Sequence, residues 1–123
     1  MADRLLQLWR REQDAIEVTA DGRHAWLDGD QEVHLSSTAA GILLVTLVRA
    51  HMQLPGQTVP YSTLFAAAWP PPATMNASGR NRLHVALSTL RRSGLRDVVE
   101  KRDDGYALRP DLVARFVTFS VSR

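Results

Sequence analysis

Apolar and polar residues alternate along three short runs near the N-terminus, from Ala15 to Ala20, His24 to Leu27 and Glu32 to Leu35. A period of two is typical of β-strands that bury one face. Asp21-Gly22 and Asp28-Gly29-Asp30 separate the runs, and Asp-Gly pairs favour tight turns. The pattern therefore predicts an antiparallel β-meander of three strands.

The period lengthens to that of an α-helix after residue 35. Thr38 to His51 is apolar nearly all round, and Ser36 and Ser37 before it are candidate N-caps. A helix of this kind either lies at the centre of a fold or presents a face to a partner, and the pattern leaves both interpretations open. Thr58-Val59 is then expected to form a short bridging strand.

A second, shorter helix is predicted from Pro60 to Trp69. Proline is favoured at the first helical position because its missing N–H would have no partner there. Pro70-Pro71-Pro72 ends this helix, and the connection that follows extends to Ala77. This connection is longer than the turn of a simple helix-turn-helix.

The third predicted helix, residues 78–93, has an apolar side and a polar, cationic side, and Asn76 or Ser78 is expected to cap it. The apolar side is formed by Leu83, Ala86, Leu87 and Leu90. The opposite side is formed by Asn81, Val85, Ser88 and Arg92. The flanks of the polar side are formed by Arg80, His84 and Arg91 on one edge, and by Arg82 and Thr89 on the other.

A β-hairpin is predicted at residues 98–108. Gly94 is a stop signal for the helix before it, and the β-branched pair Val98-Val99 favours a strand. Asp103-Asp104-Gly105 favours a turn, after which Tyr106-Ala107-Leu108 is expected to return as the second strand.

These elements predict one α+β domain over residues 15–109, with strands in 15–35, three helices in 36–93 and the hairpin in 97–109. Residues 1–14 precede it and form an amphipathic segment in which charged residues surround Leu5, Leu6, Leu8 and Trp9. Residues 110–123 follow it as a closing helix or strand. The three tryptophans, Trp9, Trp26 and Trp69, are interpreted as anchors of the core.

The composition is that of a single globular domain. The chain has 123 residues, of which 45% are hydrophobic and 23% charged. It contains no cysteine, so it has neither a disulfide framework nor a thiolate metal site. The longest apolar run, Ala39 to Val48, is about half the length of a membrane span, and the N-terminus does not have the pattern of a signal peptide. We expect a cytoplasmic protein that does not bind membranes.

The charges are divided unevenly along the chain. Residues 1–75 carry 5 arginines against 8 acidic residues, whereas residues 76–123 carry 10 Lys and Arg against 5 acidic residues. Basic patches commonly bind nucleic acid, because neutralising phosphates releases counterions. Of the 15 cationic residues, 14 are arginine, which binds phosphate and guanine in a bidentate manner. The alternative is that these arginines are solvated, or pair with Asp97, Glu100 and Asp103.

An enzyme is not expected. The four histidines are scattered without the spacing of a metal site, and no HExxH, GxSxG, GxxxxGK or GxGxxG motif is present. Asp103 and Asp104 are adjacent carboxylates at an exposed turn, which lacks the burial that acid–base catalysis by a carboxylate pair requires. The sequence predicts no metal site and no cofactor.

The order of elements resembles the OmpR/PhoB-type DNA-binding domain of bacterial response regulators. The residues that carry the resemblance are Leu35-Ser36, Leu64 to Trp69, Val85 to Leu87 with Leu90-Arg91-Arg92, and Gly105-Tyr106-Ala107-Leu108. The resemblance implies a winged helix-turn-helix with an N-terminal antiparallel β-meander, a three-helix core and a C-terminal hairpin wing. It also implies that residues 78–93 enter the major groove of DNA and that the wing, residues 98–108, lies at the adjacent backbone or minor groove.

Three features depart from this pattern. Ala86, Ser88 and Thr89 stand where family members often carry basic or histidine side chains, and Asp103 and Asp104 place acidic groups at the wing tip. The sequence begins at Met1 without the receiver domain that usually precedes this module, so a phosphorylation switch of the usual kind is not expected.

The sequence therefore supports two hypotheses. The first is a small DNA-binding transcriptional regulator that acts as a monomer or as a homodimer. In this hypothesis Asn81 binds adenine, Val85 contacts a thymine methyl group and Arg92 binds guanine. The full set of expected DNA-binding residues is Arg80, Asn81, Arg82, His84, Val85, Ser88, Thr89, Arg91, Arg92, Lys101, Arg102 and Tyr106. The second is a protein-interaction module with weak or no DNA binding, whose partner contacts Thr38–His51, residues 1–14 or the acidic residues Asp28, Asp30 and Glu32.

Overall fold

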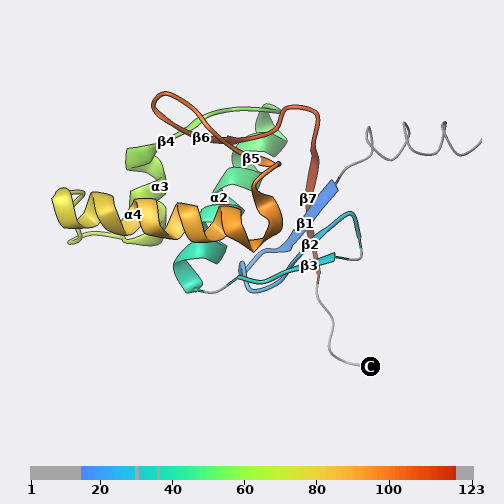
Figure 1. Ribbon diagram of the computed structural model, residues 1–123, viewed down its shortest axis with the longest axis horizontal. Helices are drawn as coiled ribbons and strands as arrows, with labels where there is room; N and C mark the ends of the chain where they lie inside the picture. The colour runs from blue at the N-terminus through green and yellow to red at the C-terminus, as the bar shows by residue number, and fades with distance from the viewer. Residues whose placement is uncertain (1–14, 30, 36, 119–123) are drawn as a thin grey trace, which may run out of the picture.

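The computed structural model describes residues 15–29, 31–35 and 37–118. Within these residues three helices, α2 (Thr38–Gln53), α3 (Tyr61–Ala68) and α4 (Ala77–Leu90), combine with two small sheets (Figure 1). The mixed α+β class predicted from the sequence is confirmed. No helix in the described part of the chain has the length and apolar character needed to cross a bilayer.

The first sheet contains the predicted meander and one further strand. Strands β1 (Ala15–Thr19), β2 (Ala25–Leu27) and β3 (Gln31–Val33) pair antiparallel in sequence order. Strand β7 (Val113–Val117) lies parallel to β1 on the other side, with Ala15 opposite Val113. The closing segment is therefore a strand over these residues, and its expected continuation over 119–123 lies outside the described residues.

The turn between β1 and β2 is held by the side chain of Asp21. Its carboxylate accepts hydrogen bonds from Thr19 Oγ1 at 2.6 Å and from the backbone N–H of Arg23 at 3.0 Å. These two bonds favour the charged carboxylate and lower the pKa of Asp21. The Asp28-Gly29 turn is present with positive φ at both residues, and Asp30 lies outside the described residues.

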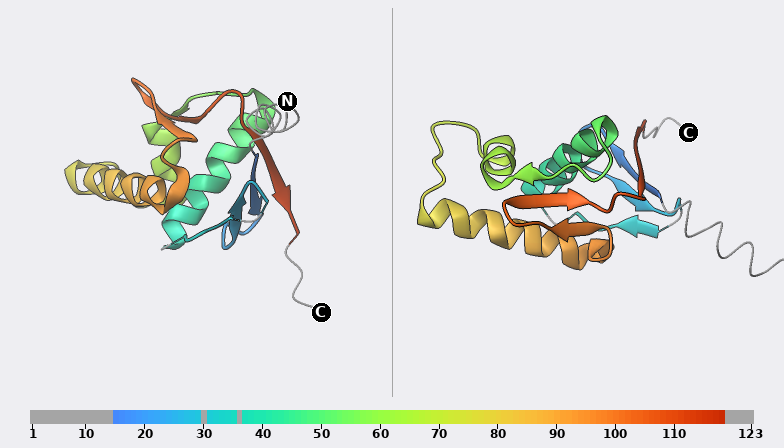
Figure 2. Two further views of the ribbon diagram at one scale, coloured as in Figure 1. Left: turned by 45° about the vertical axis from the view of Figure 1, so that its right-hand side comes forward. Right: turned by 90° about the horizontal axis from the view of Figure 1, so that it is seen from above.

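Helix α2 lies at the centre of the molecule, between the first sheet and the other two helices (Figures 1 and 2). Ser37 caps it by accepting a hydrogen bond from the N–H of Ala40 at 3.1 Å, whereas the other candidate cap, Ser36, is outside the described residues. Its buried residues are Ala40, Gly41, Leu43, Leu44, Val45, Leu47, Val48 and His51. This burial favours the central interpretation over a partner face, because most of the helix already packs inside the domain.

His51 ties the end of α2 to two other segments. The ring is 4% exposed, with Nε2 2.6 Å from the carbonyl oxygen of Leu112 and Nδ1 accepting from the N–H of Gly56 at 3.0 Å. Both bonds are satisfied when the ring is neutral with its proton on Nε2, the nitrogen that faces the carbonyl. His51 therefore fastens the chain just before β7 begins.

Replacing His51 by leucine is expected to lower the free energy of unfolding by about 1–3 kcal/mol, because the Leu112 carbonyl and the Gly56 N–H lose their partner. Urea denaturation of the two proteins measures this difference. Met52→Leu is the matched control, since Met52 is the next residue of α2 and is 53% exposed. Equal losses in both variants would contradict a role for the two hydrogen bonds.

The second sheet contains the predicted hairpin. Strand β6 (Gly105–Leu108) lies between β4 (Val59–Pro60) and β5 (Val99–Lys101), and all pairs are antiparallel. A side chain at Gly105 would place Cβ 1.9 Å from the Val59 carbonyl oxygen, so this close approach requires glycine. The sheet therefore fixes the hairpin against the strand that precedes α3.

The hairpin tip also caps helix α3. The carbonyl oxygen of Asp104 accepts a hydrogen bond from the N–H of Tyr61, the first residue of α3, at 3.1 Å. Pro60 occupies the N-cap of this helix, which corrects its predicted place at the first helical position. The correction has a physical reason, because Pro60 is also the last residue of β4 and keeps extended backbone angles.

Helix α4 forms where the sequence predicts it, within a few residues at each end. Of the two candidate caps, Asn76 is the one used, and its side chain accepts from the N–H of Gly79 at 2.9 Å. A wider helical turn, Arg91–Leu95, follows α4 and includes Gly94 with a φ of 107°. This left-handed conformation suits glycine and turns the chain toward β5.

Candidate nucleic-acid interface

Helix α4 presents one row of side chains to solvent and buries the opposite row. Leu83, Leu87 and Leu90 are 0% exposed and pack into the core. The opposite row, which we call the outward row, consists of Asn81, Val85 and Ser88 on α4 and continues with Arg92 in the wider turn that follows, and all four are exposed. The three residues of α4 follow the helical period, so a partner that lies along α4 contacts them together.

The surface around the outward row is cationic. Arg80 and Arg82 are both exposed and lie on opposite flanks of the row. No acidic residue occurs in the sequence from Ala77 to Arg96. A polyanion therefore meets several arginines along α4 and no carboxylate on the helix itself.

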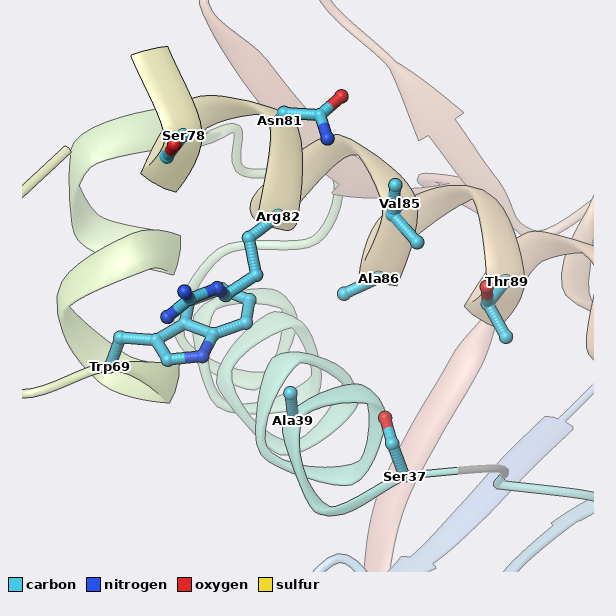
Figure 3. Close-up of a pocket in the computed structure, with 9 residues that line it drawn as sticks. All are labelled: Ser37, Ala39, Trp69, Ser78, Asn81, Arg82, Val85, Ala86 and Thr89. Atoms are coloured by element: carbon cyan, nitrogen blue, oxygen red, sulfur yellow. The ribbon is translucent and has the colours of Figure 1, made fainter. Parts of the chain in front are cut away.

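A hollow of about 630 Å³ opens beside the outward row, between α4, the end of α3 and the start of α2 (Figure 3). It is lined by Ser37, Ala39, Trp69, Ser78, Asn81, Arg82, Val85, Ala86 and Thr89. The guanidinium carbon of Arg82 lies 6.0 Å from the centre of the Trp69 ring, a distance at which the cation and the aromatic ring attract. This contact directs Arg82 toward the wall of the hollow.

The other flank of α4 meets the second sheet through aromatic rings. The ring of His84, which is exposed, lies edge-on to Tyr61 with 5.6 Å between centroids, and Tyr61 lies 6.0 Å from Tyr106. Tyr106 is only 6% exposed. It therefore packs in the core below the surface, which corrects the expectation that its side chain contacts DNA.

Two of the expected DNA-binding arginines are engaged within the protein. The Nε of Arg91 donates to the carbonyl oxygen of Val99 at 3.1 Å, and this side chain is only partly exposed. Arg102 forms an ion pair with Glu100, as the alternative interpretation of the arginines allowed. Arg91 thus joins the end of α4 to the hairpin, and the charge of Arg102 is balanced locally.

The hairpin carries charges of both signs. Lys101 is exposed on β5, and Asp103 and Asp104 are exposed at the tip. Asp97 precedes the hairpin in the sequence and Asp111 follows it. Arg109 donates to the Asp111 carboxylate at 2.6 Å. The cationic surface is therefore centred on α4 and not on the hairpin.

Sequence reasoning missed three contributors to this site. Trp69, interpreted as a core anchor, is half-buried and packs against the core with one side while lining the hollow. Ser37 caps α2 and Ala39 lies in its first turn, and α2 is distant in sequence from α4, so no local pattern could place them beside it. Trp26 is half-buried on β2, and Trp9 lies outside the described residues.

The described residues bring no three His, Cys, Asp or Glu side chains into an arrangement that could hold a metal ion. With the geometry of α4 established, the chain was compared with known protein families, curated proteins and solved structures, and none of the three comparisons found a match. A function is therefore inferred from the surface of α4.

Proposed function

We propose that this protein binds double-stranded DNA as a winged-helix transcriptional regulator of the OmpR/PhoB type. In this proposal α4 lies in the major groove, with the outward row facing the base edges. The hairpin β5–β6 acts as the wing beside the backbone or the adjacent minor groove. The observation that carries the proposal is the outward row itself: a polar, arginine-flanked helix face supported from behind by buried leucines.

The chemistry of the flanks supports this orientation. Arg80 and Arg82 lie on either side of the outward row, at the positions where the phosphates of the two strands border a major groove. The start of α2 opens on the same hollow through Ser37 and Ala39, and no acidic residue occupies its first turn. Backbone N–H groups at a helix start favour an anion, so this end of α2 suits a backbone phosphate as well.

The proposal is tested by titrating the protein into a fluorescently labelled duplex of mixed sequence and measuring anisotropy at about 50 and 200 mM salt. With the exposed arginines of α4 on phosphates, binding is expected to weaken by about 3.5-fold per phosphate contact between these two concentrations, because each contact releases counterions. Absence of binding at the lower concentration would overturn the proposal.

A second candidate function is a winged-helix module that binds a protein partner. Its specific support is the hairpin, where Asp103 and Asp104 are exposed at the tip and Arg102 is paired with Glu100, so the tip disfavours contact with phosphate. This candidate predicts little salt-dependent affinity for duplex DNA. The anisotropy titration therefore separates the two functions, and a partner would then be sought at the hairpin and the exposed residues Asp28 and Glu32.

A further inference from the structure

We infer that Val85 recognises the C5-methyl group of a thymine, and that the centre of the bound DNA site is therefore an A·T pair. The inference rests on the proposed DNA binding and names what the central part of α4 selects. It depends on three observations: the exposure of Val85, its polar neighbours on the outward row, and the absence of arginine from the central part of that row.

Val85 is an exposed apolar residue on the outward row, whose other members are polar or charged. It is 55% exposed, although valine normally gains free energy from burial and α4 already has a complete buried row. It borders the hollow next to Ala86, and Trp69 lines the same hollow at the end of α3, so the lining is partly apolar (Figure 3). In the major groove, the C5-methyl group is the apolar feature that base pairs present.

The neighbours of Val85 on the outward row sharpen this assignment. Asn81 precedes it by one helical turn and is exposed, and an asparagine amide pairs with the N6 and N7 positions of adenine. One turn of helix advances about 5.4 Å, less than two base steps of about 3.4 Å, so the two side chains address the same or adjacent base pairs.

Arginine, which would favour guanine, does not occupy the central part of the outward row, where Asn81, Val85 and Ser88 stand. Arg82 is drawn to the Trp69 ring, and Arg91 donates to the Val99 carbonyl. Arg92 lies at the far end of the outward row, about 10 Å from Val85 at the helical rise per residue. A guanine contact is therefore expected only toward the C-terminal end of α4, with the A·T pair toward its centre.

The test begins with selection of binding sequences by the full chain from a random 18-base-pair library. Each thymine of the selected duplex is then replaced by deoxyuridine, which removes only the C5-methyl group and keeps base pairing. Anisotropy titrations measure each duplex with the wild-type protein and with Val85→Ala. At one central thymine we expect about fourfold weaker wild-type binding, the equivalent of one methyl-sized apolar contact.

The Val85→Ala variant shows whether Val85 contacts that methyl group. In Val85→Ala the thymine duplex is expected to bind about four- to tenfold more weakly, and the effect of deoxyuridine at that position is expected to disappear. Val85→Ile should retain the effect. Val113→Ala is the matched control, because Val113 is also an exposed valine, at 40%, but lies on β7.

A duplex carrying 5-methylcytosine paired with guanine at the same position distinguishes the two natural sources of a C5-methyl group. Weaker binding of this duplex, with Asn81→Ala abolishing the difference, supports thymine paired with adenine as the target. Equal binding of the two methylated duplexes would overturn the A·T assignment, and a deoxyuridine effect that persists in Val85→Ala would overturn the role of Val85. Absence of any selected duplex would overturn the proposed function itself, so the two failures are distinguishable.

Discussion

Replacing both Arg80 and Arg82 by alanine is expected to weaken binding to duplex DNA by roughly tenfold near 100 mM salt and to lower its salt dependence. Both side chains are exposed, on opposite flanks of the outward row, where phosphates of the two strands would lie. Two lost phosphate contacts should reduce the slope of log affinity against log salt by about 1.8. Anisotropy titrations at four or more salt concentrations measure both quantities.

The matched control removes the same charge elsewhere. Arg49 and Arg115 lie on the β7 side of the molecule, where the Arg49 guanidinium is 5.8 Å from the Phe116 ring and Arg115 pairs with Glu17. The double variant Arg49→Ala/Arg115→Ala should change the slope little if binding is localised at α4. A similar loss in both double variants would show that net charge, and not the surface of α4, governs the interaction. Alanine favours helices, so both α4 substitutions should leave folding intact.

Replacing Leu87 by alanine is expected to lower the free energy of unfolding by about 2–5 kcal/mol. Leu87 is 0% exposed and lies between Leu83 and Leu90 in the buried row of α4. Truncation removes buried apolar surface and leaves a cavity that the surrounding leucines fill only in part. Urea denaturation followed by circular dichroism measures the change.

Ser88→Ala is the control for this prediction, because Ser88 is the next residue of α4 and is exposed on the outward row. Its effect on the free energy of unfolding should remain within about 0.5 kcal/mol, as is usual for surface substitutions. A loss of less than about 1 kcal/mol in Leu87→Ala would contradict the assignment of this row to the core.

The sequence was sufficient for features that depend on near neighbours in the chain. Three strands separated by Asp-Gly turns, an apolar first helix, and a third helix with a leucine row on its apolar side all follow from local period and turn chemistry. A cap at Asn76 or Ser78 and a stop at Gly94 are likewise local features, and the structure shows that Asn76 is the cap used. The outward row of α4, which carries the proposed function, was predicted in full and is exposed as expected.

Only the tertiary structure decided which residues beside the outward row stay exposed on the surface of α4. Arg91 and Arg92 are adjacent and chemically identical, yet Arg91 donates to Val99 while Arg92 stays exposed. Tyr106 is buried because its ring packs beside Tyr61, and Trp69 joins the site because α3 ends next to Arg82. None of these partners is within helical reach in the sequence.

The parallel pairing of β7 with β1 shows most clearly the difference between what local sequence predicts and what tertiary packing decides. Residues 113–117 have a pattern compatible with a strand or a helix, and their pairing partner is β1, at the other end of the domain. Local sequence determines period, caps and turns because those depend on bonds spanning a few residues. The partner of a strand, and the direction in which an arginine finally points, depend on which distant segments packing brings into contact.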